Sequence, residues 1–236
     1  MPTERRLYKL SQVIHQRQMD VVIALDHIHD QHNLSAVVRS ADAAGFGRII
    51  WTPDFKMTEK INPEISRGAE RWVDLKVYED LKPELLELKK QGYRIVATHM
   101  ARKAVDFRSV DWTKPSVVIF GNEHRGVSDD IVEIADDNIF LPMLGFVQSL
   151  NISVAAAVTL YEIQRQREVA GMYSKNASEE QVRDLHAKWN LKEDHVDVNN
   201  LLERMTGPMP ENDFHQDGRE NSKFFLKMKE KFLKNS

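Results

Sequence analysis

The stretch that decides the fold is Leu-Pro-Met-Leu-Gly-Phe-Val-Gln-Ser-Leu-Asn-Ile-Ser-Val-Ala-Ala-Ala-Val, residues 141–158. It begins where a short apolar strand ends, because Pro142 has no N–H to donate to a neighbouring strand. Gly145 permits a turn, and Ser149 and Asn151 are favoured N-cap residues for the helix that follows. Small residues open that helix and let another backbone approach. We therefore expect a helix packed on two sides, in the monomer and against a partner, after a turn whose N–H and C=O groups can contact a ligand.

Length and composition suit one medium domain with an appendage. The chain has 236 residues, of which 42% are hydrophobic. It contains no cysteine, so disulfides, thiolate metal sites and thiol nucleophiles are excluded. The net charge of −3 leaves only local basic patches for contact with nucleic acid. No signal peptide and no apolar run long enough to cross a bilayer is found, so we expect a cytoplasmic protein without a membrane partner.

Hydrophobic patterning predicts alternating strands and helices between residues 20 and 170. Strands are expected at residues 21–25, 48–51, 73–77, 93–98, 116–121 and 138–141. Helices are expected at residues 3–18, 34–44, 62–69, 80–91, 128–135, 150–170, 178–190 and 222–234. The almost unbroken apolar run of the fifth strand is typical of the centre of a parallel sheet. The alternation predicts an α/β fold with an open, mostly parallel sheet flanked by helices.

Composition divides the chain into three parts. Residues 1–19 form an N-terminal helical extension, residues 20–171 form the α/β domain, and residues 172–236 form a charged helical C-terminal extension. Within the last part, residues 206–218 are rich in Pro, Gly, Asn and Asp, and we interpret them as a loose linker.

Three segments place polar side chains just after predicted strands. Asn33 and Arg39 belong to the first, although Arg39 taken alone is typical of an exposed surface arginine. In the second, Gly121 lets the chain turn sharply, which holds Glu123 at the carboxyl end of the sheet, where open α/β folds bind ligands. The third is the stretch 141–158.

The usual nucleotide and metal motifs are missing. There is no G-x-G-x-x-G, P-loop or H-E-x-x-H sequence. His27, His29 and His32 are close in sequence, but no carboxylates are organised around them. We interpret these histidines as solvated loop residues and expect no metal site.

Together, in this order and spacing, the three segments resemble the SpoU-type RNA ribose 2′-O-methyltransferases of the SPOUT superfamily. The resemblance spans about residues 26–171 and is carried by residues 33–46, 120–128 and 141–158, the last being the most specific. With the N-terminal helix and residues 161–173, the chain looks most like the TrmH branch. That branch methylates the 2′-hydroxyl of a guanosine in the tRNA D-loop, expected at position 18 of the tRNA.

The resemblance implies a C-terminal deep trefoil knot, the α/β-knot of this superfamily. It implies a homodimer that shares its active site across the interface. It also implies binding of S-adenosylmethionine, with S-adenosylhomocysteine as the product, through positions matching Thr98, Gly121, Leu141 and Leu150, largely by backbone groups. The expected nucleic-acid partner is tRNA, and no DNA is expected.

The family's catalytic residue matches Arg39, and its supporting residues match Asn33, Glu123, Ser149 and Asn151. The reaction requires the ribose oxygen to be held in line and its proton to be removed. A guanidinium keeps its proton under almost all conditions. Arg39 therefore either loses a proton transiently when clamped by phosphate, or stays charged and fixes the phosphate beside the target ribose. Glu123 is expected to orient the arginine or the second loop, while Ser149 and Asn151 hold the third loop and contact RNA.

Contacts to tRNA phosphates are expected from Arg165 and Arg167, on the exposed continuation of the helix at 150–170. Arg5 and Arg6 are weaker candidates. Three other functions stay open: a ribosomal-RNA ribose 2′-O-methyltransferase of the same family, a non-catalytic RNA-binding protein, and an α/β enzyme acting on a small molecule. No N-terminal RNA-binding domain like that of the ribosomal-RNA enzymes precedes residue 20, which favours tRNA by analogy.

Overall fold

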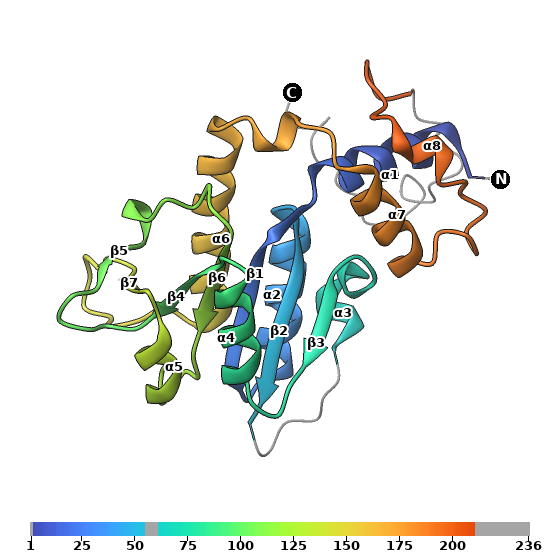
Figure 1. Ribbon diagram of the computed structural model, residues 1–236. Coiled ribbons are helices and arrows are strands. Elements are labelled where there is room, and N and C mark those ends of the chain that lie inside the picture. Colours follow the sequence, from blue (N-terminus) through green and yellow to red (C-terminus); the bar gives the residue numbers. More distant parts are fainter. Residues whose placement is uncertain (1, 55–60, 211–236) are drawn as a thin grey trace, which may run out of the picture.

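The protein is described by a computed structural model that covers residues 2–54 and 61–210. Its centre is a seven-stranded sheet in the order β3-β2-β1-β6-β4-β7-β5, and each pair of neighbouring strands is parallel (Figure 1). The strands are β1 (Gln18–Ile28), β2 (Phe46–Pro53), β3 (Asp74–Val77), β4 (Arg94–Thr98), β5 (Val105–Asp106), β6 (Ser116–Phe120) and β7 (Asp137–Phe140). The predicted open, parallel α/β sheet is confirmed.

Helices cover both faces of this sheet. The α-helices are α1 (Glu4–Gln16), α2 (Gln31–Ala43), α3 (Pro63–Ser66), α4 (Lys82–Lys90), α5 (Asp129–Ile134), α6 (Ile152–Val169), α7 (Glu179–Lys188) and α8 (Asn199–Leu202). Three 3-10 turns are η1 (Ala69–Arg71), η2 (Phe107–Ser109) and η3 (Met172–Ser174). Helices α2 and α6 pack on one face, and α4 and α5 pack on the other. None of the helices in the described ranges is both long and apolar enough to span a membrane.

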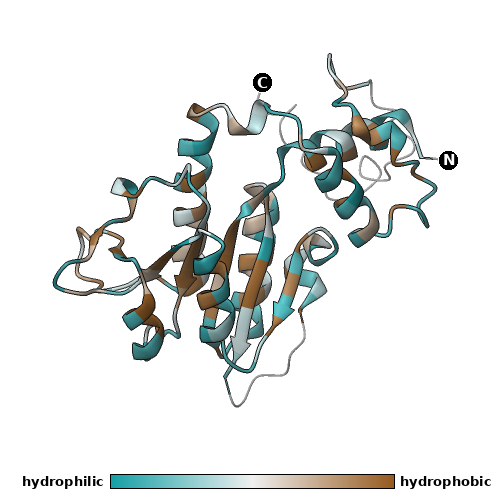
Figure 2. Ribbon diagram, in the orientation of Figure 1, coloured by the Kyte–Doolittle hydropathy of each residue, from teal (hydrophilic) through white to brown (hydrophobic). Residues whose placement is uncertain are grey.

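Alternate side chains of β1 point to opposite faces of the sheet, and each set packs into the apolar cluster on its own face. Val21 and Ile23 join the cluster under α2 and α6, whereas Val22 and Ala24 join the cluster under α4 and α5. Because each face is covered, the middle of the central strands is apolar, as the brown segments in Figure 2 show.

Residues 26–32, which contain the three histidines interpreted as loop residues, do not form a simple polar loop before α2. Strand β1 continues to Ile28, and its pairing with β2 reaches Pro53 through an irregular step. At that step His27 has a φ of 50°, and its N–H donates to the buried Thr52 hydroxyl at 2.7 Å. Asp30 then caps α2, so Asn33 lies inside the first turn and its side chain is available for other contacts.

A third apolar cluster joins α1, α7 and α8, which we call the terminal module. Leu10 and Ile14 of α1 pack with Val182 of α7 and Leu201 of α8. Figure 1 shows this module beside the start of β1. The helix expected at residues 222–234, and all but the first residues of the expected linker at 206–218, lie outside the described residues.

Candidate functional site

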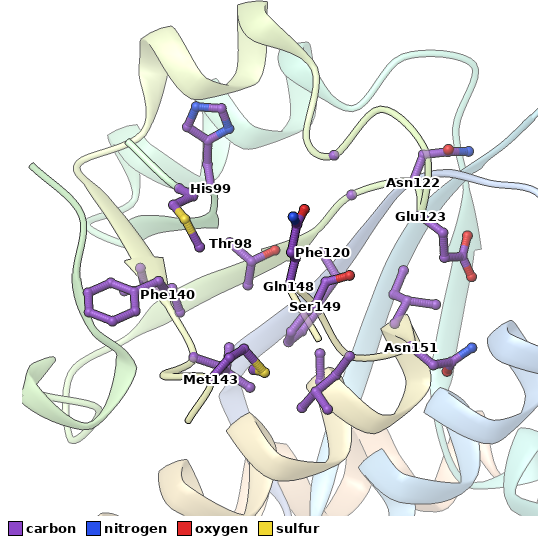
Figure 3. A pocket seen from close by; sticks show the side chains of 18 residues that line it. Thr98, His99, Phe120, Asn122, Glu123, Phe140, Met143, Gln148, Ser149 and Asn151 are labelled. Atoms are coloured by element: carbon purple, nitrogen blue, oxygen red, sulfur yellow. The ribbon is translucent and has the colours of Figure 1, made fainter. Parts of the chain in front are cut away.

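A cavity of about 380 Å³ lies at the carboxyl ends of β4, β6 and β7 (Figure 3). Three loops form its walls: the loop after β4, the loop after β6, and the long loop between β7 and α6. All four residues expected to contact the cofactor line this cavity, namely Thr98, Gly121, Leu141 and Leu150. Three residues expected to act in catalysis line it as well, namely Glu123, Ser149 and Asn151. The sheet edge that open α/β folds use for ligands therefore carries the predicted site.

The loop after β6 folds back tightly on itself. Asn122 and Gly126 exchange two backbone hydrogen bonds, at 3.0 and 2.8 Å. A Cβ on Gly121 would lie 2.0 Å from the carbonyl carbon of Gly126 and 2.0 Å from the nitrogen of Val127. Only glycine fits at this position, because any side chain would collide with backbone atoms.

A chain of polar contacts joins the first turn of α2, the loop after β6 and the start of α6. The Asn33 side-chain N–H donates to Glu123 Oε1 at 2.5 Å, and the Asn151 side-chain N–H donates to Asn33 Oδ1 at 3.1 Å. The other carboxylate oxygen of Glu123 lies 2.8 Å from His29 Nδ1. Although Glu123 as a residue is exposed, its side chain is only 19% exposed. Both of its oxygens are therefore engaged at the wall of the cavity.

Asn151 has two separate tasks at the start of α6. Its Oδ1 accepts the backbone N–H of Ser153 at 2.9 Å, which caps the helix, while its Nδ2 contacts Asn33. Ser149 is exposed at the cavity wall, which it lines together with Gln148 and Thr98 (Figure 3). The Thr98 hydroxyl already donates to the Ile119 carbonyl at 2.9 Å.

Arg39 is the one expected catalytic residue that stands apart. It is exposed on α2 and does not line the cavity. No hydrogen bond or ion pair joins its side chain to another residue in the described part of the chain. Within a single chain, the structure therefore brings together the other four expected residues without Arg39.

The expectation that Arg167 lies on an exposed helix face is wrong. Its side chain is 0% exposed and forms an ion pair with Asp20 at 2.6 Å. It also donates to the Trp112 carbonyl at 2.9 Å. Arg167 follows the buried Ile163 by four positions, on the buried stripe of α6. That spacing was a signal in the sequence that Arg167 would face the core.

Of the remaining arginines expected to bind RNA, Arg6 and Arg165 are exposed. Arg165 makes two hydrogen bonds to Glu162, at 2.7 and 2.8 Å, and these lower the pKa of that carboxyl. Arg6 pairs at 2.9 Å with Asp194 of the C-terminal extension, so it has a structural contact of its own. Arg5, on the same helix, is half-buried. RNA contact by Arg5, Arg6 and Arg165 stays a prediction.

Three polar residues of the site were missed or misjudged from the sequence. His29 is not simply solvated, because its Nδ1 lies 2.8 Å from Glu123 Oε2. Its ring stacks on the ring of His124, with centroids 5.3 Å apart. The Asn122 side chain donates to the His27 carbonyl at 2.8 Å, which ties the loop after β6 to the end of β1. No group of three or more histidine, aspartate or glutamate side chains within the described ranges is arranged to hold a metal ion.

Comparison with known proteins gives a consistent result. A sequence model of the SpoU rRNA Methylase family matches residues 20–161. The tRNA (guanosine(18)-2′-O)-methyltransferase of Aquifex aeolicus is 44% identical over 187 residues, covering 79% of this chain and 89% of that protein. The enzyme of the same name from Escherichia coli K12 is 38% identical over 175 residues, covering 73% of this chain and 75% of that protein.

A solved structure extends the likeness to three dimensions. The A. aeolicus TrmH/SpoU tRNA modifying enzyme superposes with a TM-score of 0.75 at 44% identity, covering 82% of this chain and 98% of that one. The sheet order, the cavity and the loops around it thus occur in a chain whose sequence matches the same family over more than half its length. This chain belongs to the SpoU methylase family.

Proposed function

We propose that this protein transfers a methyl group from S-adenosylmethionine to the ribose 2′-hydroxyl of a guanosine in the tRNA D-loop, at position 18. The observation that carries the proposal is the cavity, whose walls hold the four expected cofactor residues beside Glu123, Ser149 and Asn151. The substrate is supported by relatives at 38–44% identity that are named for guanosine 18 of tRNA. The cytoplasm, where tRNA is modified, is the proposed location.

The cavity fits the cofactor on structural grounds. Its volume of about 380 Å³ lies in the range of small-molecule sites. Gly121 leaves its backbone open to close approach, and the Thr98 hydroxyl is already bonded within the sheet. Thr98, Gly121, Leu141 and Leu150 would therefore hold the molecule mainly through backbone groups. When bound, S-adenosylmethionine supplies a methyl group on a cationic sulfur, which needs little further activation.

The protein's own residues position the ribose and handle its proton. The hydrogen bond between Asn33 and Asn151 joins the first turn of α2 to the start of α6, and this fixes one wall of the site. Oε1 of Glu123 accepts a hydrogen bond from Asn33, and Oε2 lies 2.8 Å from His29 Nδ1, so in this proposal Glu123 orients its neighbours and does not take the proton. Arg39 either takes the proton while clamped by phosphate or fixes the phosphate beside the ribose.

A homodimer would complete the site. Val154, Val158 and Tyr161 are exposed at positions i, i+4 and i+7 of α6, and Leu144 and Phe146 of the preceding loop are fully exposed. An apolar patch of this kind is typical of an interface. Since Arg39 does not reach the cavity of its own chain, we propose that a second copy, docked on α6, brings the two together.

The trefoil knot is proposed on the family membership. Two features support it. Strand β6 lies between β1 and β4, although β4 comes earlier in the chain. The loop at 141–151 also forms the cavity together with the ends of β4 and β6, two strands that precede it.

The test is transfer of labelled methyl from S-adenosylmethionine to bulk tRNA and to ribosomal RNA, with the wild type and Arg39→Ala. We expect label in the D-loop guanosine of tRNA, and a loss of about 10²–10⁴-fold in the variant if Arg39 is the base. Cofactor affinity, measured by calorimetry, should not change, because Arg39 does not line the cavity. Label in ribosomal RNA alone would overturn the substrate. Cofactor binding without transfer to either RNA would instead favour a binding-only protein.

A further inference from the structure

A β-turn presents two neighbouring cations just beyond the carboxyl end of β4. The Ala104 N–H donates to the Ala101 carbonyl at 2.9 Å, which closes the turn. Arg102 and Lys103 are its two central residues, and both are exposed. The turn begins directly after Met100, which lines the cavity of the candidate site. We call Arg102 and Lys103 the rim cations.

Strand β7 fixes this turn on both sides. Before the turn, the His99 N–H donates to the Ile139 carbonyl at 3.2 Å, and after the turn Val105 of β5 pairs with Ile139. Beyond Phe140, the chain of β7 continues into the loop at 141–151, which forms another wall of the cavity. The rim cations are thus anchored to the strand that leads into the site.

The rim cations have no acidic partner within residues 2–54 and 61–210. Most arginines of these ranges pair with a carboxylate. The nearby Asp106 is already held by Arg108, whose Nε donates to it at 2.9 Å. By contrast, no hydrogen bond or ion pair to another described residue involves the side chain of Arg102 or Lys103. Their charges are therefore available to an anion from outside the chain.

The cavity itself offers no cation to a phosphate. The described residues that line it include Glu123 as a carboxylate, but neither an arginine nor a lysine. In the loop after β6, Arg125 is held by Asp54 at 3.3 Å. A ribose that enters the cavity brings the charged phosphates of its own strand to the rim. The rim cations are well placed to neutralise them.

We propose that Arg102 and Lys103 bind phosphates of the D-loop that flank the target guanosine, so that the turn after β4 forms part of the tRNA-binding surface. The inference rests on the proposed function and adds an RNA contact to it. Phosphate contacts position a nucleic acid without reading its sequence. The rim cations therefore contribute to tRNA affinity and to its salt dependence. They do not contribute to cofactor binding, because neither side chain lines the cavity.

The test compares two double variants that lose the same charge. The rim variant combines Arg102→Gln with Lys103→Gln. The control variant combines Lys76→Gln with Lys175→Gln. Both control lysines are exposed, have no ion pair in the described part of the chain, and line a separate cavity next to α7. Lys76 lies on β3, at the opposite edge of the sheet from β5.

The measurement is a titration of each protein with tRNA at several salt concentrations. In the rim variant we expect affinity to fall about 10-fold, and the slope of log K against log salt to decrease by about 1 to 2. The cofactor Kd and Tm should not change, since both side chains are exposed and unpaired. The control variant should keep the wild-type slope. Equal slopes in the rim variant and wild type would overturn the proposal, and so would equal losses of affinity in the two double variants.

A second measurement, phosphate ethylation interference on tRNA, locates the contact. Ethylation of D-loop phosphates next to the target guanosine should block binding of the wild type and no longer affect the rim variant. An unchanged interference pattern, or a change only outside the D-loop, would contradict the proposed contact. Both measurements depend on binding and not on methyl transfer. A wild-type protein that binds tRNA without methylating it would therefore overturn the proposed function alone, whereas one that does not bind tRNA would overturn both proposals.

Discussion

At the scale of single residues, Gly121 shows how backbone packing constrains the site. In Gly121→Ala the new Cβ would lie 2.0 Å from two backbone atoms of the same loop, which must then move. We expect a loss of about 3 kcal/mol or more in the free energy of unfolding, measured by urea denaturation, and a loss of cofactor binding by calorimetry. Gly145→Ala is the control, because nothing lies within 4 Å of its Cβ position. Wild-type cofactor affinity in Gly121→Ala would contradict this account of the loop.

Arg165 and Arg167 differ by two positions and should behave in opposite ways. Arg167→Met removes a buried cation and its bonds to Asp20 and to buried carbonyls, so we expect a loss of about 2–4 kcal/mol in unfolding free energy. We expect the loss of unfolding free energy in Arg167→Met to lie towards the lower end of this range, because Asp20 is partly exposed and can be solvated. Arg165→Met removes only an exposed ion pair, so we expect little change in the free energy of unfolding.

The two variants should also differ in RNA binding. Arg165→Met should weaken tRNA affinity and reduce its salt dependence if Arg165 contacts a phosphate. Titrations at several salt concentrations, beside denaturation curves of both variants, check this. A fully stable Arg167→Met would be at odds with the buried ion pair, and an unchanged salt slope in Arg165→Met would remove Arg165 from the RNA interface.

At the scale of elements, the start of α6 combines a cap with a contact of the site. Asn151→Ala loses both, and the missing cap should cost about 1 kcal/mol. Asn151→Asp keeps an oxygen for the Ser153 N–H and adds a charge that a helix N-terminus favours, but it cannot donate to Asn33. We therefore expect Asn151→Asp to keep the wild-type Tm and to lose methyl transfer. Parallel thermal melts and transfer assays test this, and full activity in Asn151→Asp would make the Asn33 contact dispensable.

At the scale of the whole molecule, His15 couples the terminal module to pH. Its Nε2 lies 2.9 Å from the Leu201 carbonyl, and its Nδ1 accepts the Ala177 N–H at 3.0 Å, so only the neutral ring satisfies both contacts. Burial lowers the pKa of His15 below 6.5, and the contact with Leu201 opposes this in part. The unfolded chain then binds a proton more readily than the folded one. The stabilisation is complete above pH 6.5 and is lost as pH falls through the lower pKa of the folded state.

We therefore expect Tm to fall between pH 7.5 and 5.5, and amide exchange in α1, α7 and α8 to rise before exchange in the sheet. His15→Gln retains a donor and an acceptor without a group that titrates in this range, so its Tm should depend less on pH. Equal pH dependence of the two proteins would exclude His15 as the cause.

The proposed dimer makes a prediction about α6. Val158→Asp places a charge in the centre of the exposed apolar stripe without disturbing the core, because Val158 faces away from the sheet. We expect a folded monomer by light scattering, with wild-type far-UV CD and little methyl transfer, since Arg39 would no longer reach a second cavity. Val169→Asp, at the exposed far end of the same helix, is the control. An active Val158→Asp monomer would show that one chain completes the site.

The sequence by itself determined the alternation of the main strands and helices of the parallel sheet, although the short strand β5 and helix α8 were not expected. It also predicted a site at the carboxyl edge of the sheet. These features depend on local chemistry: apolar runs covered on both faces, Gly121 in a tight turn, and Asn151 at a helix start. The boundaries at residues 19/20 and 171/172 stay a prediction. The sequence pattern placed the end of β1 too early, because the irregular pairing of β1 with β2 at His27 is invisible in hydropathy.

Only the tertiary structure decided which polar groups meet. Asn33 contacts Glu123, 90 residues away in the chain, and Asn151, 118 residues away, because β1, β6 and β7 end at one edge of the sheet. In the same way, the burial of Arg167 depends on Asp20, 147 residues distant. Local pattern fixes which residues lie on one face of an element, whereas the partner on another element is fixed by how the strands cross and pack. That is the physical reason why Arg167 and His29 were misjudged while the parallel sheet flanked by helices was predicted correctly.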